Sequence, residues 1–394
     1  MPQITKLRFD SDGEPAELGK SIKTALLDNY AQRLRYYSTG HPVAYSFEQF
    51  SSDLTHLEIR IGIDSVPLLP RINAASLRKL VLDDIPSEFS WQCFEQQMPK
   101  DTFKLIRFSN LQVLELYFAG QLEDTGGEQQ LSRTDTAENQ YQMEFPKLHS
   151  LSITNYPPNA AMSLAAKYPS HLKQLTLRYS FIPPNVFVRS DIRSVDSLDV
   201  TLYYAQLEHP DNFYALTNHL FGRVTVSKNH SSLLMSYSEF QLDHSRIQWS
   251  NLSVIRIMSQ VDYLIMEQMV RMMPQLEKLI IYELTFTQQS MPISNESCNN
   301  QQTMVYDAPW ETSIRYLEIL SLAYISKPEV ITLCIKRFLE HLPLLCSLHI
   351  NGYEAVGMND FSNLFKPQHR HMLLQTASAV ADNHDGNGSL QTTE

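Results

Sequence analysis

The side chains that could do chemistry are scattered along the chain and form no known catalytic motif. The sequence lacks Gly-x-Ser-x-Gly, Gly-x-x-x-x-Gly-Lys-Ser/Thr and His-Glu-x-x-His, the patterns that present a nucleophile, cradle phosphate or bind catalytic zinc. Only 12 of the 394 residues are glycine, which disfavours a glycine-rich phosphate loop. We therefore expect neither an enzyme nor a bound cofactor.

Two weak patterns could hold a metal ion. His369 and His371 form the tightest histidine pair, but no third ligand lies near them in the sequence. Residues 383–394 place oxygen ligands at the first, third, fifth and twelfth positions of a calcium loop, with Gly388 at the sixth. Asn383 replaces the usual aspartate at the first position, and no second loop follows the same pattern. We favour a solvated polar tail and predict no metal site.

A further set of side chains suits protein recognition, because Tyr, Met and Arg are enriched at the centres of protein interfaces. The candidates are Arg178, Arg223, Arg256, Met258, Lys278, Ile280, Tyr282, Tyr316 and Leu320. The cations would form a basic strip and the others an adjoining apolar and aromatic patch. Together they suit an acidic segment of a partner protein that carries an apolar anchor. The alternative is that they are ordinary strand side chains, with the apolar ones covered by a loop such as 287–303.

A recurring motif is what would bring these candidates together. It reads Leu-x-x-Leu-x-Ile or a close variant, as in Leu54/Leu57/Ile59. Further copies begin at Ile4, Leu77, Leu111, Leu148, Leu172, Val195, Leu252, Leu276, Ile314 and Leu345, with a poor copy at Phe221/Val224/Val226. About 11–12 copies are expected, and neighbouring copies are often 23 or 24 residues apart.

Each copy predicts a short β-strand. Alternate side chains of a strand face opposite ways, so the fourth and sixth positions point to one side, where the first joins them. Stacked in parallel, the copies bury that apolar side as a continuous core. The third, fifth and seventh positions, which include every candidate above, then line the open face.

Parallel strands need crossover connections, and several segments suit helices. Residues 211–220, 261–273 and 328–342 carry apolar side chains at helical spacing, and a helix over 14–37 is expected to cover the first strand. The polar insertions 121–143 and 287–303 cannot bury enough apolar surface to become ordered. We predict an α/β solenoid over 1–370, with a parallel sheet on its concave face and helices or loops on its convex face. A terminal helix fragment and disordered tail follow over 371–394.

Composition limits the environment and the partners. The net charge of -11 repels polyanions, so we expect neither nucleic acid nor an anionic membrane as a partner. Four cysteines, at 93, 298, 334 and 346, show no metal-binding or paired spacing. With no signal-peptide pattern at the amino terminus, these features favour a cytoplasmic or nuclear protein with reduced thiols.

The repeated motif, and its entry through an apolar residue and proline as in Met273-Pro274, resemble leucine-rich-repeat proteins. The likeness is to the ribonuclease-inhibitor-like class, especially fungal F-box/leucine-rich-repeat proteins, and it extends to about Gly352. No F-box is recognisable, and the asparagine that commonly follows the last apolar position is absent from nearly every copy. The resemblance implies a horseshoe-shaped solenoid that binds protein on its concave face.

These observations lead to two functional expectations. The first is a non-enzymatic protein-binding module, which by resemblance is the substrate-recognition subunit of an F-box-type ubiquitin ligase and would also bind a ligase adaptor. The second is a scaffold or inhibitor that acts by covering a partner protein, with no link to ubiquitin ligases. The two differ in whether a second surface docks a ligase core.

Overall fold

The computed structural model describes the chain in segments that together hold two compact units. The described residues are 4–9, 16–42, 52–60, 75–85, 108–119, 145–155, 172–180, 192, 194–203, 210–236, 243–286, 310, 312–323, 334–335 and 337–350. Unit 1 comprises residues 1–219 and 224–229, and unit 2 comprises residues 220–223 and 230–394. The division passes through helix α3 (Pro210–Gly222) and strand β9 (Thr225–Ser236).

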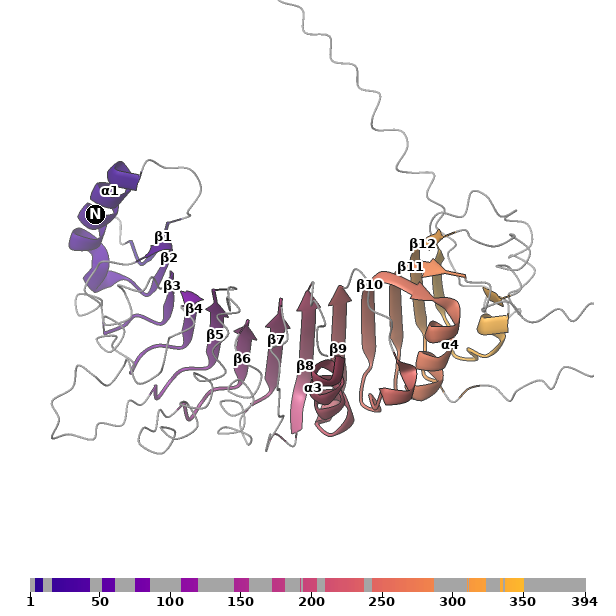
Figure 1. Ribbon diagram of the computed structural model, residues 1–394. Coiled ribbons are helices and arrows are strands. Elements are labelled where there is room, and N and C mark those ends of the chain that lie inside the picture. The colour runs from indigo at the N-terminus through magenta and orange to yellow at the C-terminus, as the bar shows by residue number, and fades with distance from the viewer. Residues whose placement is uncertain are drawn as a thin grey trace, which may run out of the picture. The chain divides into compact units, whose positions relative to one another are not determined.

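Unit 1 contains eight strands in which each pairs with the next along the chain, always in parallel (Figure 1). The strands are β1 (Lys6–Phe9), β2 (Tyr36–Pro42), β3 (His56–Arg60), β4 (Lys79–Ile85), β5 (Val113–Phe118), β6 (Ser150–Thr154), β7 (Gln174–Tyr179) and β8 (Ser194–Tyr203). Helix α1 (Ala16–Tyr30) and the short helix η1 (Ala31–Arg33) connect β1 to β2. This arrangement is an α/β fold built on a parallel sheet.

Unit 2 repeats the same plan with β9 followed by four strands, again all parallel and in chain order. These are β10 (Val254–Asp262), β11 (Lys278–Thr285), β12 (Tyr316–Ala323) and β13 (Ser347–Ile350). The short helix η5 (His244–Arg246) precedes β10, and helix α4 (Tyr263–Met272) connects β10 to β11. Residues 334–335 and 337–340 are also helical.

The core lies on one side of each sheet and is made by the apolar positions of the motif. In β3 the side chains of Leu57 and Ile59 are buried, whereas His56, Glu58 and Arg60 are partly exposed. The same alternation recurs in β5, β6, β7 and β13. Burial of each such Leu or Ile stabilises the fold by about 1.5–3 kcal/mol, so the period-two pattern fixes which way each strand faces. In these strands the predicted inward and outward positions are confirmed, whereas Val81 and Ile280, which were predicted to face outward, are buried.

A ladder of backbone hydrogen bonds joins successive copies just before their strands begin. The carbonyl of Arg35 accepts hydrogen bonds from the N–H groups of both Thr55 and His56, at 2.9 and 3.1 Å. The second position of nearly every described copy repeats this double acceptance, through the carbonyls of Thr5, Thr55, Arg78, Gln112, His149, Lys173, Ser253, Glu277 and Arg315. Because these bonds join backbone atoms, the side chain at the second position can face solvent, as Arg35, Thr55 and Arg78 do, although Ser253 at the same position is buried.

Two helices fall where the sequence predicts crossovers, and a third differs from its prediction. Helix α4 lies within the predicted segment 261–273, and α3 covers the predicted segment 211–220. The helix expected over 14–37 ends at Tyr30 as α1, because Tyr36 and Tyr37 begin strand β2. That strand is a copy of the motif that the sequence analysis missed, with a buried Tyr and a buried Thr at its fourth and sixth positions.

The placement of the poor copy at Phe221/Val224/Val226 is wrong. In unit 2, β10 pairs with the later part of β9, where Leu233 lies opposite Ile255 and Met235 opposite Ile257. Both Leu233 and Met235 are fully buried, as the fourth and sixth positions of a copy must be. Phe221 belongs to helix α3 instead.

Several expectations concern segments outside the described residues. These are the insertions 121–143 and 287–303, the pair His369/His371, the calcium-loop-like stretch 383–394, the terminal region 371–394, Trp91, Cys93 and Cys298. Of the other two cysteines, Cys334 is buried and Cys346 is exposed, and both are free thiols. No helix within the described part of the chain combines the length and apolar character needed to cross a membrane.

Candidate functional site

Apart from Arg223, the candidate residues of unit 2 lie on the sheet face that points away from the core. In β10, Ile255 and Ile257 are buried, whereas Arg256 and Met258 between and after them are exposed. The same alternation continues through β12 and, except at the buried Ile280, through β11. We call this surface the β10–β12 face, made of Arg256, Met258, Lys278, Ile280, Tyr282, Tyr316, Glu318 and Leu320.

The strand register sets the neighbours on this face. Lys278 lies opposite Val254 on one side and Tyr316 on the other. One step along, Ile280 lies between Arg256 and Glu318, and Glu318 in turn lies opposite His349 of β13. Adjacent strands are roughly 4.8 Å apart, so side chains from β10 to β13 make a continuous surface.

Tyr316 is the centre of a cluster of contacts on the β10–β12 face. The Lys278 ammonium lies 4.1 Å from the centroid of the Tyr316 ring, which is cation–π geometry. The Tyr316 hydroxyl donates a 2.8 Å hydrogen bond to Glu318 Oε2. The His349 ring stacks on Tyr316 with centroids 5.3 Å apart, and its Nε2 lies 3.1 Å from Ser347 Oγ. These contacts hold the tyrosine ring in place before any partner arrives.

The surroundings of Tyr316 also keep its hydroxyl protonated. Burial raises the pKa of the Tyr316 phenol, and the hydrogen bond to Glu318 and that carboxylate's charge raise the pKa further. A negative charge on the phenol would lie beside a second negative charge, which is unfavourable. Tyr316 is therefore a hydrogen-bond donor throughout the physiological pH range.

Apolar surface is exposed next to this cluster. Met258 is 39% exposed and Tyr282 is 48% exposed, and Leu320 is half-buried. Ile280, by contrast, is only 9% exposed, so the prediction that it forms an exposed part of the patch is wrong. Ile280 lies between Arg256 and Glu318 in the register and is almost fully buried.

Of the three cations in unit 2 that were predicted to form a strip, two are neighbours. Arg256 and Lys278 lie on the adjacent strands β10 and β11. Arg223 is exposed but precedes β9 and is not in the paired register of the sheet. Its predicted place beside Arg256 is taken by Leu234, which lies opposite Arg256. The correction follows from the shifted position of the ninth strand.

Arg178 belongs to unit 1 and has neighbours of its own there. It lies opposite Thr154, which lies opposite Tyr117 on the next strand. Burial and the charge of Glu115 raise the pKa of the Tyr117 phenol, whereas a hydrogen bond and the charge of Arg178 oppose that increase. Glu115 in turn accepts hydrogen bonds from Tyr117 at 3.1 Å and from Lys79 at 2.7 Å. Arg178 is thus part of a network of compensated charges in unit 1.

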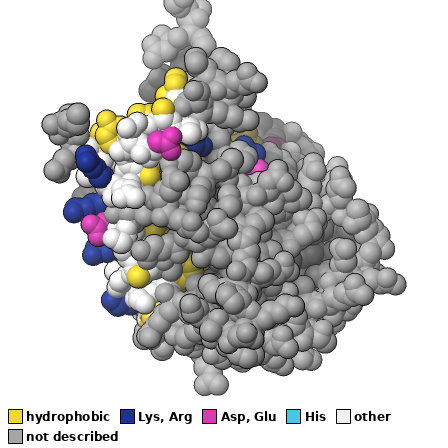
Figure 2. Space-filling view, turned by 90° about the vertical axis from the view of Figure 1, so that its left-hand side faces the viewer, with side chains coloured by type: hydrophobic (Ala, Val, Ile, Leu, Met, Phe, Trp, Pro, Cys, Tyr) yellow, Lys and Arg dark blue, Asp and Glu magenta, His cyan; other side chains and the backbone are white. Residues whose placement is uncertain are grey.

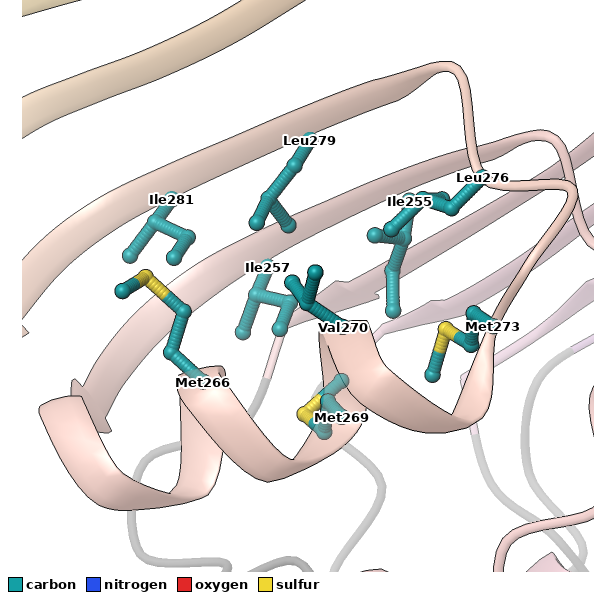
Figure 3. Close-up of a pocket in the computed structure, with 9 residues that line it drawn as sticks. All are labelled: Ile255, Ile257, Met266, Met269, Val270, Met273, Leu276, Leu279 and Ile281. Atoms are coloured by element: carbon teal, nitrogen blue, oxygen red, sulfur yellow. The ribbon is translucent and has the colours of Figure 1, made fainter. Parts of the chain in front are cut away.

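The side of the sheet covered by α4 is packed core and offers no ligand site. Figure 3 shows Met266 and Val270 directed at apolar side chains of β10 and β11, and Met269 and Met273 line the same cavity. The cavity among them measures about 10 Å³, no more than a single water molecule needs. Trp249 and Trp310 are buried as well, so both contribute to packing.

Sequence reasoning located the exposed positions of the β10–β12 face but not the contacts among them. Glu318 and His349 complete the cluster around Tyr316, yet neither was selected as a site residue. The signal available in the sequence was their position in the motif, at the fifth place of two successive copies. Which side chains then meet depends on rotamers, which the motif does not encode.

Within the described residues, no group of three or more His, Cys, Asp or Glu side chains is placed to hold a metal ion. Comparison with known proteins adds no assignment, since no family model, curated protein or solved structure matches this chain. The geometry of the β10–β12 face is therefore the basis for a functional interpretation.

Proposed function

We propose that this chain is a non-enzymatic protein-binding module of the leucine-rich-repeat type, and that the β10–β12 face contacts its partner. The observation that carries the proposal is an ordered tyrosine cluster flanked by exposed apolar and cationic side chains. Lys278, Tyr316 and Glu318 are already fixed by mutual contacts, so binding costs little side-chain entropy. Met258 and Tyr282 then provide apolar contact area of the kind found at interface centres.

The same face suggests the chemistry of the partner. Arg256 is exposed and has no hydrogen bond or ion pair within the described part of the chain. A carboxylate of the partner would satisfy its guanidinium in a bidentate manner, while an apolar side chain would rest on Met258 and Tyr282. The proposed ligand is thus an acidic protein segment with an apolar anchor.

By its resemblance to F-box/leucine-rich-repeat proteins, the module would recognise substrates for a ubiquitin ligase. The alternative is a scaffold or inhibitor that covers its partner. A ligase subunit must hold adaptor and cullin through a second surface, whereas a scaffold or inhibitor needs only the face that binds the partner. This difference defines the experiment.

The full chain, used as bait in its own cells, would be compared with Arg256→Glu/Tyr282→Ser by quantitative mass spectrometry. The matched control is Arg223→Glu/Tyr203→Ser, which makes the same chemical changes at exposed positions outside the β10–β12 face. We expect partners to be lost with the first variant and retained with the control. Retention of all partners by both variants would contradict a role for this face. If adaptor and cullin copurify with all three baits, the protein is a ligase subunit. If neither copurifies and one partner is recovered in stoichiometric amount, a scaffold or inhibitor is favoured.

A further inference from the structure

A second group of cations lies in unit 1, at the amino-terminal ends of strands β1 to β4. The backbone ladder places Arg35 and Arg78 at the same position of two copies, with Thr55 between them. One residue further along each strand, Lys6 lies opposite Tyr36, Tyr36 lies opposite His56, and His56 lies opposite Lys79. We call Lys6, Arg35, Arg78 and Lys79 the N-terminal cationic group, and the His56 ring lies among them.

Part of this group is engaged within unit 1 and part is not. Lys79 donates to Glu115 at 2.7 Å, and the Lys6 ammonium lies 4.5 Å from the Tyr36 ring centroid. Arg35 and Arg78 are exposed, and neither side chain forms a hydrogen bond or ion pair among the residues that the structure describes. Two guanidinium groups therefore remain available to a ligand.

His56 shows that the positive charge around it is not fully compensated. Burial lowers the pKa of the His56 imidazole, and the charges of Lys79, Arg78 and Lys6 lower the pKa further. Glu58, two residues further along β3, accepts a 3.4 Å hydrogen bond from the Tyr36 hydroxyl. Figure 2, which looks at the end of unit 1 where β1 and α1 lie, shows Lys and Arg side chains gathered along one margin of the described surface.

We propose that the N-terminal cationic group is a docking surface for an acidic segment of a protein partner, separate from the β10–β12 face. Strands are roughly 4.8 Å apart, so Arg35 and Arg78 are about 10 Å apart along the row. An acidic segment that runs across the strands would meet a cation at nearly every strand. Each free guanidinium can bind a carboxylate through two parallel hydrogen bonds.

Charge favours a short acidic segment over nucleic acid. The protein as a whole carries a net charge of -11, and its field repels a long polyanion more strongly than a peptide with a few carboxylates. Nucleic acid also gains most of its affinity from many phosphate contacts, whereas Arg35 and Arg78 are the two members of this group that have no partner among the described residues.

The test uses the full chain and a fluorescein-labelled hexaglutamate peptide, with binding followed by fluorescence anisotropy at low ionic strength. Arg35→Glu/Arg78→Glu should weaken binding by at least about tenfold, because two attractive charges become repulsive. The control Lys173→Glu/Arg315→Glu makes the same change in charge at exposed side chains whose backbone carbonyls occupy the same ladder position. We expect less than about a threefold effect from the control, through net charge alone.

Two outcomes would overturn the proposal. One is peptide binding that Arg35→Glu/Arg78→Glu leaves unchanged or weakens no more than the control does. The other is a labelled hexathymidine oligonucleotide that binds more tightly than the peptide and loses that affinity in Arg35→Glu/Arg78→Glu. The variant Arg256→Glu/Tyr282→Ser serves as a further arm. A loss confined to that variant would assign the peptide to the β10–β12 face and also contradict the proposal.

Discussion

At the scale of single residues, two aromatic side chains show how neighbouring charges set the chemistry of an exposed strand. Tyr316 lies between Lys278 and Glu318, and its pKa is raised. His56 lies among Lys6, Arg78 and Lys79, and its pKa is lowered. Both shifts favour the neutral form near pH 7, so both rings interact with a partner as hydrogen-bonding and stacking groups.

The surroundings of His56 give a prediction about pH. Removal of one cation by Arg78→Gln should raise the pKa of the His56 imidazole, because its protonated form is then less repelled. The groups that remain around it are Lys6, Lys79 and the Tyr36–Glu58 pair. The pKa would be read from an NMR titration of the histidine ring, with Arg315→Gln in unit 2 as the control. An equal change in both variants would contradict the assignment.

The sign of the accompanying stability change is fixed by the lowered pKa. As the pH falls, the His56 imidazole takes up a proton at a higher pH in the unfolded chain, where its pKa is about 6.5, than in the folded chain. The stabilising contribution of neutral His56 is therefore complete above about pH 6.5 and is lost as pH falls through the folded-state value. Arg78→Gln should make that loss smaller, which urea unfolding at several pH values would measure.

At the scale of elements, most strands follow from the motif, and the two exceptions have physical reasons. Strand β2 was missed because Tyr37 and Thr39 stand where Leu and Ile stand in other copies, although both are buried. The ninth copy was placed at Val224 and Val226, which alternate as well as Leu233 and Met235 do. The alternation of apolar residues does not show which of these two segments pairs with the next strand, because the register depends on pairing with the neighbouring strand.

A pair of buried serines fixes that register in unit 2. Ser253 Oγ donates to the carbonyl of Ser231 at 2.8 Å and accepts from the N–H of Ser231 at 2.9 Å. Ser231 Oγ in turn accepts from the N–H of Ser253 at 2.9 Å and donates to the carbonyl of Asn251. The two side chains thus satisfy backbone groups where β9 lacks the usual apolar residue at the first position.

This serine pair leads to a prediction about stability. Ser253→Ala leaves the buried N–H of Ser231 without its partner, so the free energy of unfolding should fall by about 1–3 kcal/mol. Ser259→Ala, at a half-buried position on the same strand, should change it by less than about 0.5 kcal/mol. Urea unfolding measures both. Equal effects of the two substitutions would show that the serine pair does not fix the register.

At the scale of the whole molecule, contacts are made mainly between successive copies. Each strand in the described pairs bonds only to the strands before and after it, so stability is expected to be a sum of local terms. The composition and the recurrence of the motif were enough to predict this plan. They could not predict the two units, which depend on how many contacts cross residues 219–230.

A core substitution tests this locality. Leu279→Ala removes a side chain that is 2% exposed in β11 and should cost about 2–5 kcal/mol. Hydrogen exchange should accelerate for the amides of β10, β11 and β12 and stay unchanged for those of β3, β4 and β5. Met258→Ala, at an exposed position of the neighbouring strand, is the control. Equal acceleration in both groups of strands would mean that the chain unfolds as one cooperative body.

The backbone ladder carries a consequence for how such a chain changes over time. Since the carbonyl at the second position ties one copy to the next through backbone N–H groups, residues of many kinds can occupy that place, apart from the buried Ser231 and Ser253, whose side chains also bond to the backbone. Arg35, Thr55, Arg78, Gln112 and Lys173 already differ in size and charge there. The buried Leu and Ile must be retained for the fold to form, whereas the exposed positions tolerate substitution. Substitutions can therefore change the outer surface one residue at a time. The protein can gain or lose a partner in this way while its fold is retained.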